Sequence, residues 1–138
     1  MVREWILFHK KLISDFLRRF VIRRRNSRFI TAANAVARLT RKSVRFNQVQ
    51  KHLFTAVDKS AQLTVFFSNE IQGYRCYRDG LKKRAGRIGQ IYFLDKIPLR
   101  DNEHVIDCGA NNGDIKLWFE LNSIAVKYNG IEPSPHEF

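Results

Sequence analysis

The sequence predicts an α/β fold in which basic helices precede the first strand, helix and strand of an open parallel sheet. Val105 and Ile106 are β-branched and apolar and run into a glycine turn, which is typical of a buried strand that ends in a tight corner. A helix is predicted from about Asp114 to Leu121, and a second apolar run from Ala125 to Ile131 predicts the next strand. With 138 residues, of which 44% are hydrophobic, the chain has the size and composition of one domain with a core.

The positive charge of the chain lies in its first part. The net charge is +12, and residues 1–60 hold 15 Lys and Arg against three acids, whereas residues 61–138 hold 10 of each. We therefore divide the chain into a basic amphipathic helical region, residues 1–60, and a neutral region, residues 61–138. The neutral region has the charge balance of an ordinary enzyme domain, so the basic region needs an explanation of its own.

Residues 1–22 are predicted to form an amphipathic helix. Apolar side chains recur at helical spacing on one face, namely Trp5, Phe8, Leu12, Phe16 and Phe20. Lys11, Asp15 and Arg18 lie on the opposite face. Charged residues interrupt any run of the ~20 apolar residues that a membrane crossing requires. No small-residue cleavage site follows, which also excludes a secretory signal.

A cluster of arginines follows this helix, at positions 23, 24, 25 and 28, before a second helical stretch at about residues 31–39. Three interpretations of the basic region stay open. The helix packs its apolar face on the domain while the arginines face water. Alternatively, residues 1–28 lie on an anionic membrane surface. Nucleic-acid binding is the least favoured, because the region has no aromatic-interleaved sheet and no recognisable reading helix.

The middle of the chain is predicted to contain short elements. Residues 62–67 are rich in β-formers and predict a strand, which residues 73–77 continue as a hairpin. Residues 80–85 have weak helical character, and residues 90–94 fit a helix or a strand equally well. Residues 97–103 form a polar turn that leads into the central strand.

The glycine turn has the composition of a ligand-binding corner. Gly109 and Gly113 can adopt backbone conformations closed to other residues, and they let a ligand approach the main chain without meeting a Cβ. The next helix points its free N–H groups into the same turn. Glu132 ends the second strand 19 residues after Gly113, where a strand–helix–strand unit holds ribose hydroxyls. Asn111 occupies the position of the glycine that a bound pyrophosphate requires. This makes a nicotinamide-dependent oxidoreductase a less favoured interpretation but does not exclude it.

Two sequence blocks resemble a known family. The order Asp-x-Gly-x-x-x-Gly, followed by an acid at the end of the next strand, resembles the motif of class I S-adenosylmethionine-dependent methyltransferases. In detail, VIDCGANNGD followed by IEPSPHEF resembles the FkbM-type family, whose first motif carries Gly-Ala-Asn. The resemblance implies an incomplete Rossmann-like class I sheet. It also implies methyl transfer from S-adenosylmethionine to an oxygen of a small-molecule or glycan acceptor.

The resemblance also assigns roles to residues. Asp107, Gly109 and Gly113 would shape the cofactor crevice, and Glu132 would accept hydrogen bonds from the ribose. The backbone from Ala110 to Gly113, including Asn111, would hold the amino-acid end of the cofactor.

Three upstream positions carry aromatic or basic side chains that have more than one interpretation. Tyr92 lies either in this crevice or in the core. Arg84 and Arg87 either reach a substrate or are solvated, and solvation is the favoured interpretation.

No catalytic residue is implied, because the adenine pocket, the acceptor pocket and a general base come from later strands of such a sheet. We therefore expect an N-terminal part of a methyltransferase that is inactive alone, and whether the chain itself is an enzyme stays open.

Other functions remain compatible with the same residues. Asn111 and Asn112 tolerate left-handed conformations, so turn geometry alone explains them equally well. The rival function is a non-enzymatic module whose basic N-terminus binds a membrane or a nucleic acid. Cys76 and Cys108 are the only cysteines, which argues against a disulfide framework and favours a reducing, cytoplasmic compartment or the inner face of a membrane. The four histidines are scattered, so no metal site is expected.

Overall fold

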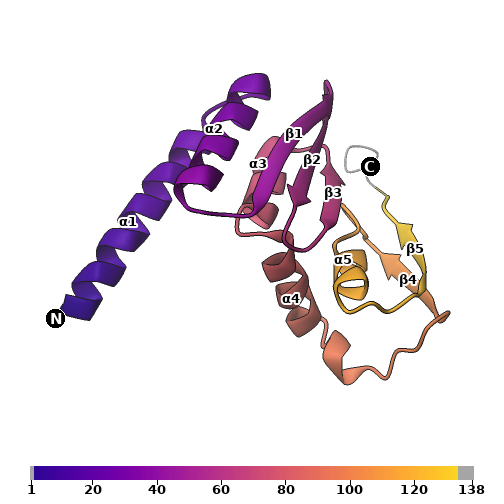
Figure 1. Cartoon of the computed structure of the whole chain (residues 1–138). Helices are drawn as coiled ribbons and strands as arrows, with labels where there is room; N and C mark the ends of the chain where they lie inside the picture. Colours follow the sequence, from indigo (N-terminus) through magenta and orange to yellow (C-terminus); the bar gives the residue numbers. More distant parts are fainter. Residues whose placement is uncertain (1, 134–138) are drawn as a thin grey trace.

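The computed structural model describes residues 2–133, and only the backbone of residues 2, 3, 6–8, 10 and 11. The described chain is a mixed α/β structure (Figure 1). Its helices are α1 (Val2–Ile22), α2 (Asn26–Leu39), α3 (Glu70–Tyr77), α4 (Leu81–Ile91) and α5 (Asp114–Leu121), with a short 3-10 helix, η1 (Leu94–Lys96). Its strands are β1 (Val44–Gln50), β2 (Leu53–Asp58), β3 (Leu63–Phe67), β4 (His104–Cys108) and β5 (Lys127–Ile131).

The first sheet is an antiparallel meander in the order β1-β2-β3. Its buried face follows the alternation of the strands, as in β3, where Leu63, Val65 and Phe67 are buried and the residues between them are exposed. The predicted strand at residues 62–67 is thus confirmed. The prediction of a helical region over residues 1–60 is wrong for residues 44–58, which form β1 and β2. The expected boundary at residue 60 falls between two paired strands of this sheet.

Aromatic rings fill the core between this sheet and the helices α2 and α3. The ring of Phe29 on α2 meets Phe46, Phe54 and Tyr74 edge to face, with ring centroids 6.1 to 6.3 Å apart. The side chain of Asn34 also ties α2 to β1, because its Nδ2 donates to the Phe46 carbonyl at 2.7 Å and its Oδ1 accepts from the Phe46 N–H at 2.8 Å. These contacts satisfy backbone groups at the sheet edge.

Helix α1 contacts the rest of the molecule mainly through its C-terminal end (Figure 1). Val21 is buried, and Leu17 and Ile22 pack against the core. Among the described side chains of the apolar face, Trp5 and Phe16 are 63% and 69% exposed. The predicted helix is confirmed, but its described apolar face does not pack on the domain. No helix within residues 2–133 has the length and apolar character needed to cross a membrane.

Residues 73–77 belong to α3, so the predicted hairpin is wrong there. The helix begins after Asn69, whose Oδ1 accepts hydrogen bonds from the N–H groups of Ile71 and Gln72, both at 3.1 Å. Helix α4 extends the weak helical prediction at residues 80–85 to Ile91, and Gln90 and Ile91 are its last residues.

The second sheet consists of β4 and β5, which are parallel and pair Val105 with Tyr128. The predicted strand, helix and strand of residues 104–131 are confirmed as β4, α5 and β5. Helix α5 packs against α4, where Gly89 leaves room for the indole of Trp118. Ile106 and Ile131 are exposed, so part of the apolar surface of this small sheet is uncovered within the described chain.

Candidate functional site

The corner after β4 lies beside the end of β5. Since the strands are parallel, their carboxyl ends meet at one edge of the sheet, where Cys108 pairs with Ile131. The N–H groups of Gly109 and Ala110 both donate to the Ile131 carbonyl, at 2.8 and 3.1 Å. The chain turns sharply here because Gly109, Asn111 and Gly113 all have positive φ angles, of 81°, 49° and 70°. Gly113 then caps the start of α5.

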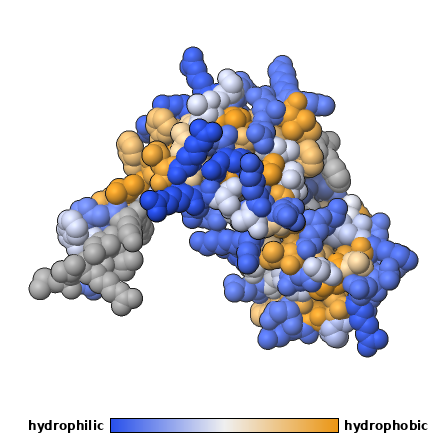
Figure 2. All heavy atoms as spheres, viewed as in Figure 1, coloured by the Kyte–Doolittle hydropathy of each residue, from blue (hydrophilic) through white to orange (hydrophobic). Residues whose placement is uncertain are grey.

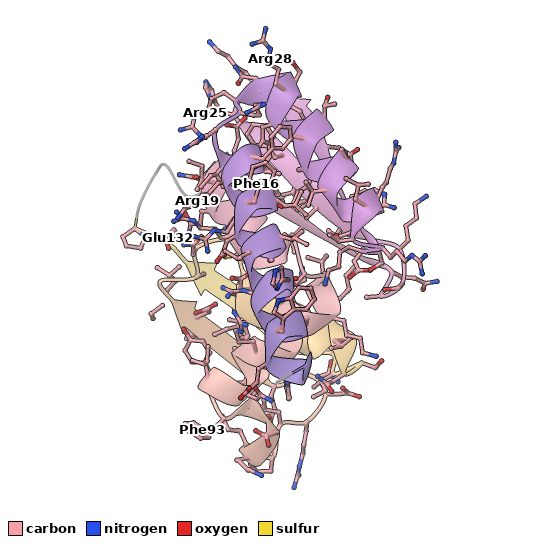
Figure 3. The ribbon with its side chains drawn as sticks, turned by 90° about the vertical axis from the view of Figure 1, so that its left-hand side faces the viewer. Phe16, Arg19, Arg25, Arg28, Phe93 and Glu132 are labelled. Atoms are coloured by element: carbon pink, nitrogen blue, oxygen red, sulfur yellow. The ribbon has the colours of Figure 1, made fainter. Side chains whose placement is uncertain are left out.

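Glu132 meets this corner directly. It follows the last residue of β5 (Figure 3), and its Oε2 accepts a hydrogen bond from the N–H of Asn111 at 2.8 Å. The acid at the end of the second strand and the glycine corner after the first therefore form one unit. The remaining residues of the second block, 134–138, lie outside the described residues.

A cleft of 290 Å³ opens between this corner and the first sheet. It is lined by residues from both halves of the chain, namely Leu53, Phe66, Phe67, Ser68, Ala110, Asn111, Asn112, Gly113, Tyr128 and Gly130. Apolar rings thus face the backbone and amides of the glycine corner. Such a combination of an apolar wall with a few polar groups is typical of small-molecule sites, although this volume is just below their usual range of about 300 to 1,000 Å³.

The six residues predicted to bind a cofactor lie at or beside this cleft. Ala110, Asn111 and Gly113 line it. Glu132 is hydrogen-bonded to one of the lining residues, and Gly109 is bonded to the end of β5. The structure therefore brings five of these residues together at one corner, and the sixth, Asp107, is connected to the cleft through Tyr128.

Asp107 is buried and bound to Tyr128. The Tyr128 hydroxyl donates a short hydrogen bond to Asp107 Oδ2. Burial and this carboxylate together raise the pKa of Tyr128 well above its ordinary value, so the hydroxyl keeps its proton. Asp107 therefore fixes the ring that lines the cleft.

Tyr92 does not take the position in the crevice that the resemblance suggested. It follows α4, is 53% exposed, and is absent from the described lining of the cleft. Tyr128, which the sequence analysis did not select, is the tyrosine at the cleft.

A partly buried ionic cluster lies next to the corner, at the start of α5. Asp114, the first residue of α5, accepts from the Tyr77 hydroxyl at 2.8 Å and from Arg84 Nε at 3.0 Å. The interpretation of Arg84 as solvated is wrong, because its side chain is only 20% exposed. Arg87 is exposed as expected. An acid at the first helical position was the available signal for Asp114, since such residues favour the positive end of the helix dipole.

Two features of the corner fit a bound ligand. A Cβ built on Gly109 meets no atom within 4 Å, so the space above this residue is open. Among the described residues, Asn111 Oδ1 is a buried acceptor without a hydrogen-bond partner. A buried acceptor without a partner costs about 1 to 3 kcal/mol, which a ligand N–H or O–H would relieve.

A larger groove of 620 Å³ lies between α1, α2 and α3, and it is a weaker candidate. Its walls are mainly apolar, and its only described carboxylate, Asp79, is already paired with Lys42 at 3.2 Å and with Arg78 at 3.9 Å. The groove therefore offers fewer groups for recognising or converting a substrate than the glycine corner does.

No protein-family model, curated protein or solved structure matches the chain. The interpretation of the site therefore depends on the geometry of its residues. What the geometry provides is a backbone corner open to a ligand, an acid bonded to it, and an apolar wall opposite. This arrangement can bind a small polar molecule with an apolar part.

Proposed function

We propose that the corner and cleft bind S-adenosylmethionine and form part of a Rossmann-like, FkbM-type methyltransferase site. The observation that carries this proposal is the hydrogen bond of 2.8 Å between the Asn111 N–H and Glu132 Oε2. It joins the glycine corner of the first parallel strand to the acid at the end of the second. In an α/β sheet, ligands bind in the crevice at the carboxyl ends of such strands.

The chain's residues would divide the work of holding the cofactor. The open backbone at Gly109 faces the amino-acid end, and Asn111 Oδ1 accepts a hydrogen bond from its ammonium group. Glu132 faces the ribose hydroxyls. Tyr128 and Phe66 supply the apolar wall. The fit is partial, since the cleft of 290 Å³ is small for the whole cofactor.

The bound cofactor supplies an electrophilic methyl group for transfer to an acceptor oxygen. The described residues position the cofactor, and we assign none of them as a general base. The proposed acceptor is a small molecule or a glycan. We therefore propose weak cofactor binding and no methyl transfer by these residues alone.

Amide chemical shifts of the 138-residue chain test this proposal. Titration with S-adenosylmethionine should shift the amide signals of residues 109–113 and 132. The expected Kd is about 1 mM, and chemical shifts detect binding of this strength. Titration with a nicotinamide dinucleotide should shift them less, because Asn111 occupies the position of the pyrophosphate-binding glycine.

A matched pair of glycine variants makes the test specific. Gly109→Ala places a methyl group at the open corner and strains a residue with φ of 81°, so binding should fall at least about tenfold. Gly86→Ala lies in α4 with no atom within 4 Å of the added Cβ, and it should bind as the wild type does. Unchanged corner amides at about 5 mM cofactor, or equal binding by both variants, would overturn the proposal.

A further inference from the structure

Helix α1 carries an apolar face that points away from the molecule. The described side chains at positions 5, 12, 16 and 20 are all exposed, and they recur at helical spacing on one side. Ile13 is exposed at the edge of this face, where it lines the groove beside α2 and α3. The side toward the body instead carries buried Val21 and the partly buried Arg18, whose Nε has no hydrogen-bond partner among the described residues. The amphipathic helix thus faces its apolar side outward. Figure 2 shows apolar surface on the part of α1 that lies next to the body.

Arginines border this face at one end. Arg19, Arg23, Arg25 and Arg28 are exposed. Figure 3 shows Phe16 facing the viewer, with Arg19 to its left and Arg25 and Arg28 above it. The Arg24 guanidinium lies 4.2 Å from the ring centroid of Phe20, so cations and aromatic rings interleave. Of these arginines, Arg25 lies 3.9 Å from the carboxylate of Glu70.

We infer that α1 is a docking helix for an anionic membrane surface, on which its apolar face enters the interface while the arginines contact lipid phosphates. A helix of 21 residues is about 30 Å long, and it would lie in the plane of the interface because it is too charged to cross the bilayer. Aromatic residues beside arginines are typical of such helices. This inference does not depend on cofactor binding.

The charged and apolar side chains of α1 together favour an anionic membrane over a second copy of the chain or a nucleic acid. A second copy of α1 would cover the apolar side chains but bring few acids to the arginines, since Glu4 and Asp15 are the only acids in the sequence of this helix. A nucleic acid would contact the arginines but leave the exposed Trp5, Leu12 and Phe16 in water. An anionic bilayer accepts both the cations and the apolar side chains, since each Lys or Arg near its surface contributes about 1 kcal/mol.

Vesicle co-sedimentation of the full chain tests the inference. The chain should bind vesicles of phosphatidylcholine with about 30% phosphatidylserine at low salt, and bind vesicles of phosphatidylcholine alone much more weakly. Binding should weaken at high salt, because screening removes the contribution of the arginines.

Matched variants separate the two contributions. Phe16→Ser should weaken binding about tenfold, whereas Phe93→Ser should leave it unchanged, although the two side chains are 69% and 67% exposed. Phe93 lies at the opposite end of the molecule from Arg28 (Figure 3). The double variant R23Q/R28Q should weaken binding to the anionic vesicles roughly 30-fold. The control R38Q/R41Q removes two exposed arginines outside the cluster and should have little effect.

Several results would overturn the inference. One is that the chain does not bind the anionic vesicles. Another is that the Phe16 and Phe93 variants lose vesicle binding to the same extent. A third is a dimer in sedimentation equilibrium that Phe16→Ser dissociates, without vesicle binding, since the occupant would then be a second copy. Binding of an RNA duplex that Phe16→Ser leaves unchanged, again without vesicle binding, would assign the arginines to nucleic acid.

Discussion

Asp58 is a buried carboxylate that connects the first sheet to α4. It ends β2, and its Oδ2 accepts from the N–H of Leu81, the first residue of α4, at 2.8 Å. Its Oδ1 accepts from Ser60 Oγ at 2.7 Å and from the Ser60 N–H at 3.1 Å. One side chain therefore closes the turn after β2 and satisfies a free N–H at a helix start.

We predict that Asp58 makes stability fall in acid. Burial raises the pKa of this carboxyl, but the hydrogen bonds from Ser43, Ser60 and Leu81 together lower it by more. The pKa therefore lies below the ordinary value. A depressed pKa in the folded state contributes stability above the unfolded pKa of about 3.9, and this stability is lost as the pH falls through the folded pKa. Urea unfolding at pH 6 and pH 3 should show Asp58→Asn destabilised by about 2 kcal/mol at pH 6 and less affected at pH 3.

The control for this prediction is Asp95→Asn. The Asp95 side chain is 57% exposed and pairs only with Lys96 at 3.3 Å among the contacts described. Its loss should change stability by less than about 1 kcal/mol at either pH. An Asp58 variant whose deficit is the same at both pH values would contradict the proposed role of ionisation.

Residue roles were predictable where a backbone constraint fixes the residue type. Gly109 and Gly113 have the positive φ angles that glycine suits, as the turn pattern predicted. Arg84 and Tyr128 were missed because their partners, Asp114 and Asp107, are 30 and 21 residues away in the sequence. A side chain's long-range partner leaves no local pattern, so exposure was the default interpretation for Arg84.

At the scale of elements, α3 shows how one residue can mislead. Gly73 favoured a turn, and residues 73–77 were predicted as a hairpin. The helix-start signal was present upstream, since Asn69 followed by Gln72 three residues later is a capping-box pattern. The glycine is required by packing, because a Cβ at Gly73 would lie 2.1 Å from Phe67 Cδ2.

We predict opposite signs for two Gly→Ala substitutions in helices. Alanine is favoured over glycine by about 1 kcal/mol in a helix interior, so Gly86→Ala should stabilise the chain by up to that amount. Gly73→Ala should destabilise it by about 2 kcal/mol, because Phe67 is held among other core rings and cannot move away. Thermal unfolding of both variants measures the difference. Stabilisation by Gly73→Ala would show that the core beside α3 relaxes freely.

The strands β1 and β2 were missed for another reason. Val44 and Phe46 alternate with polar residues, which is a strand signal, but it spans only a few residues. The excess of arginine and lysine over residues 1–60 was assigned to helices throughout. A high content of charged residues indicates an exposed surface but does not indicate a helix. The helical periodicity of α1 therefore gave no information on residues 44–58, which form strands.

At the scale of the whole molecule, the cleft depends on two parts that meet through few polar contacts. The first sheet supplies one wall, and the corner after β4 supplies the other. The local unit from β4 to Glu132 was predictable from its sequence because its strands and helix are consecutive. The opposing wall from Leu53 and Phe66 was not, since it comes from residues more than 40 positions upstream of the corner.

The Asp114 cluster is the main polar connection between these parts, and we predict that it sets their cooperativity. Asp114 on α5 holds Tyr77 from α3 and Arg84 from α4, and the side chains of Arg84 and Asp114 are 20% and 14% exposed. Asp114→Ala leaves a mostly buried guanidinium without its partner, which should cost about 3 kcal/mol. Hydrogen exchange should then show residues 104–131 opening at lower free energy than β1 to β3.

Glu120→Ala is the matched control on the same helix. Glu120 pairs with Lys116 at 3.6 Å, and both side chains are largely exposed, so its removal should cost no more than about 0.5 kcal/mol and leave the exchange pattern unchanged. Because Asp114 sits just after Gly113, separate opening of this region should also weaken ligand binding at the corner. Equal loss of protection in both sheets of the Asp114 variant would show instead that apolar packing between α4 and α5 already joins the two parts.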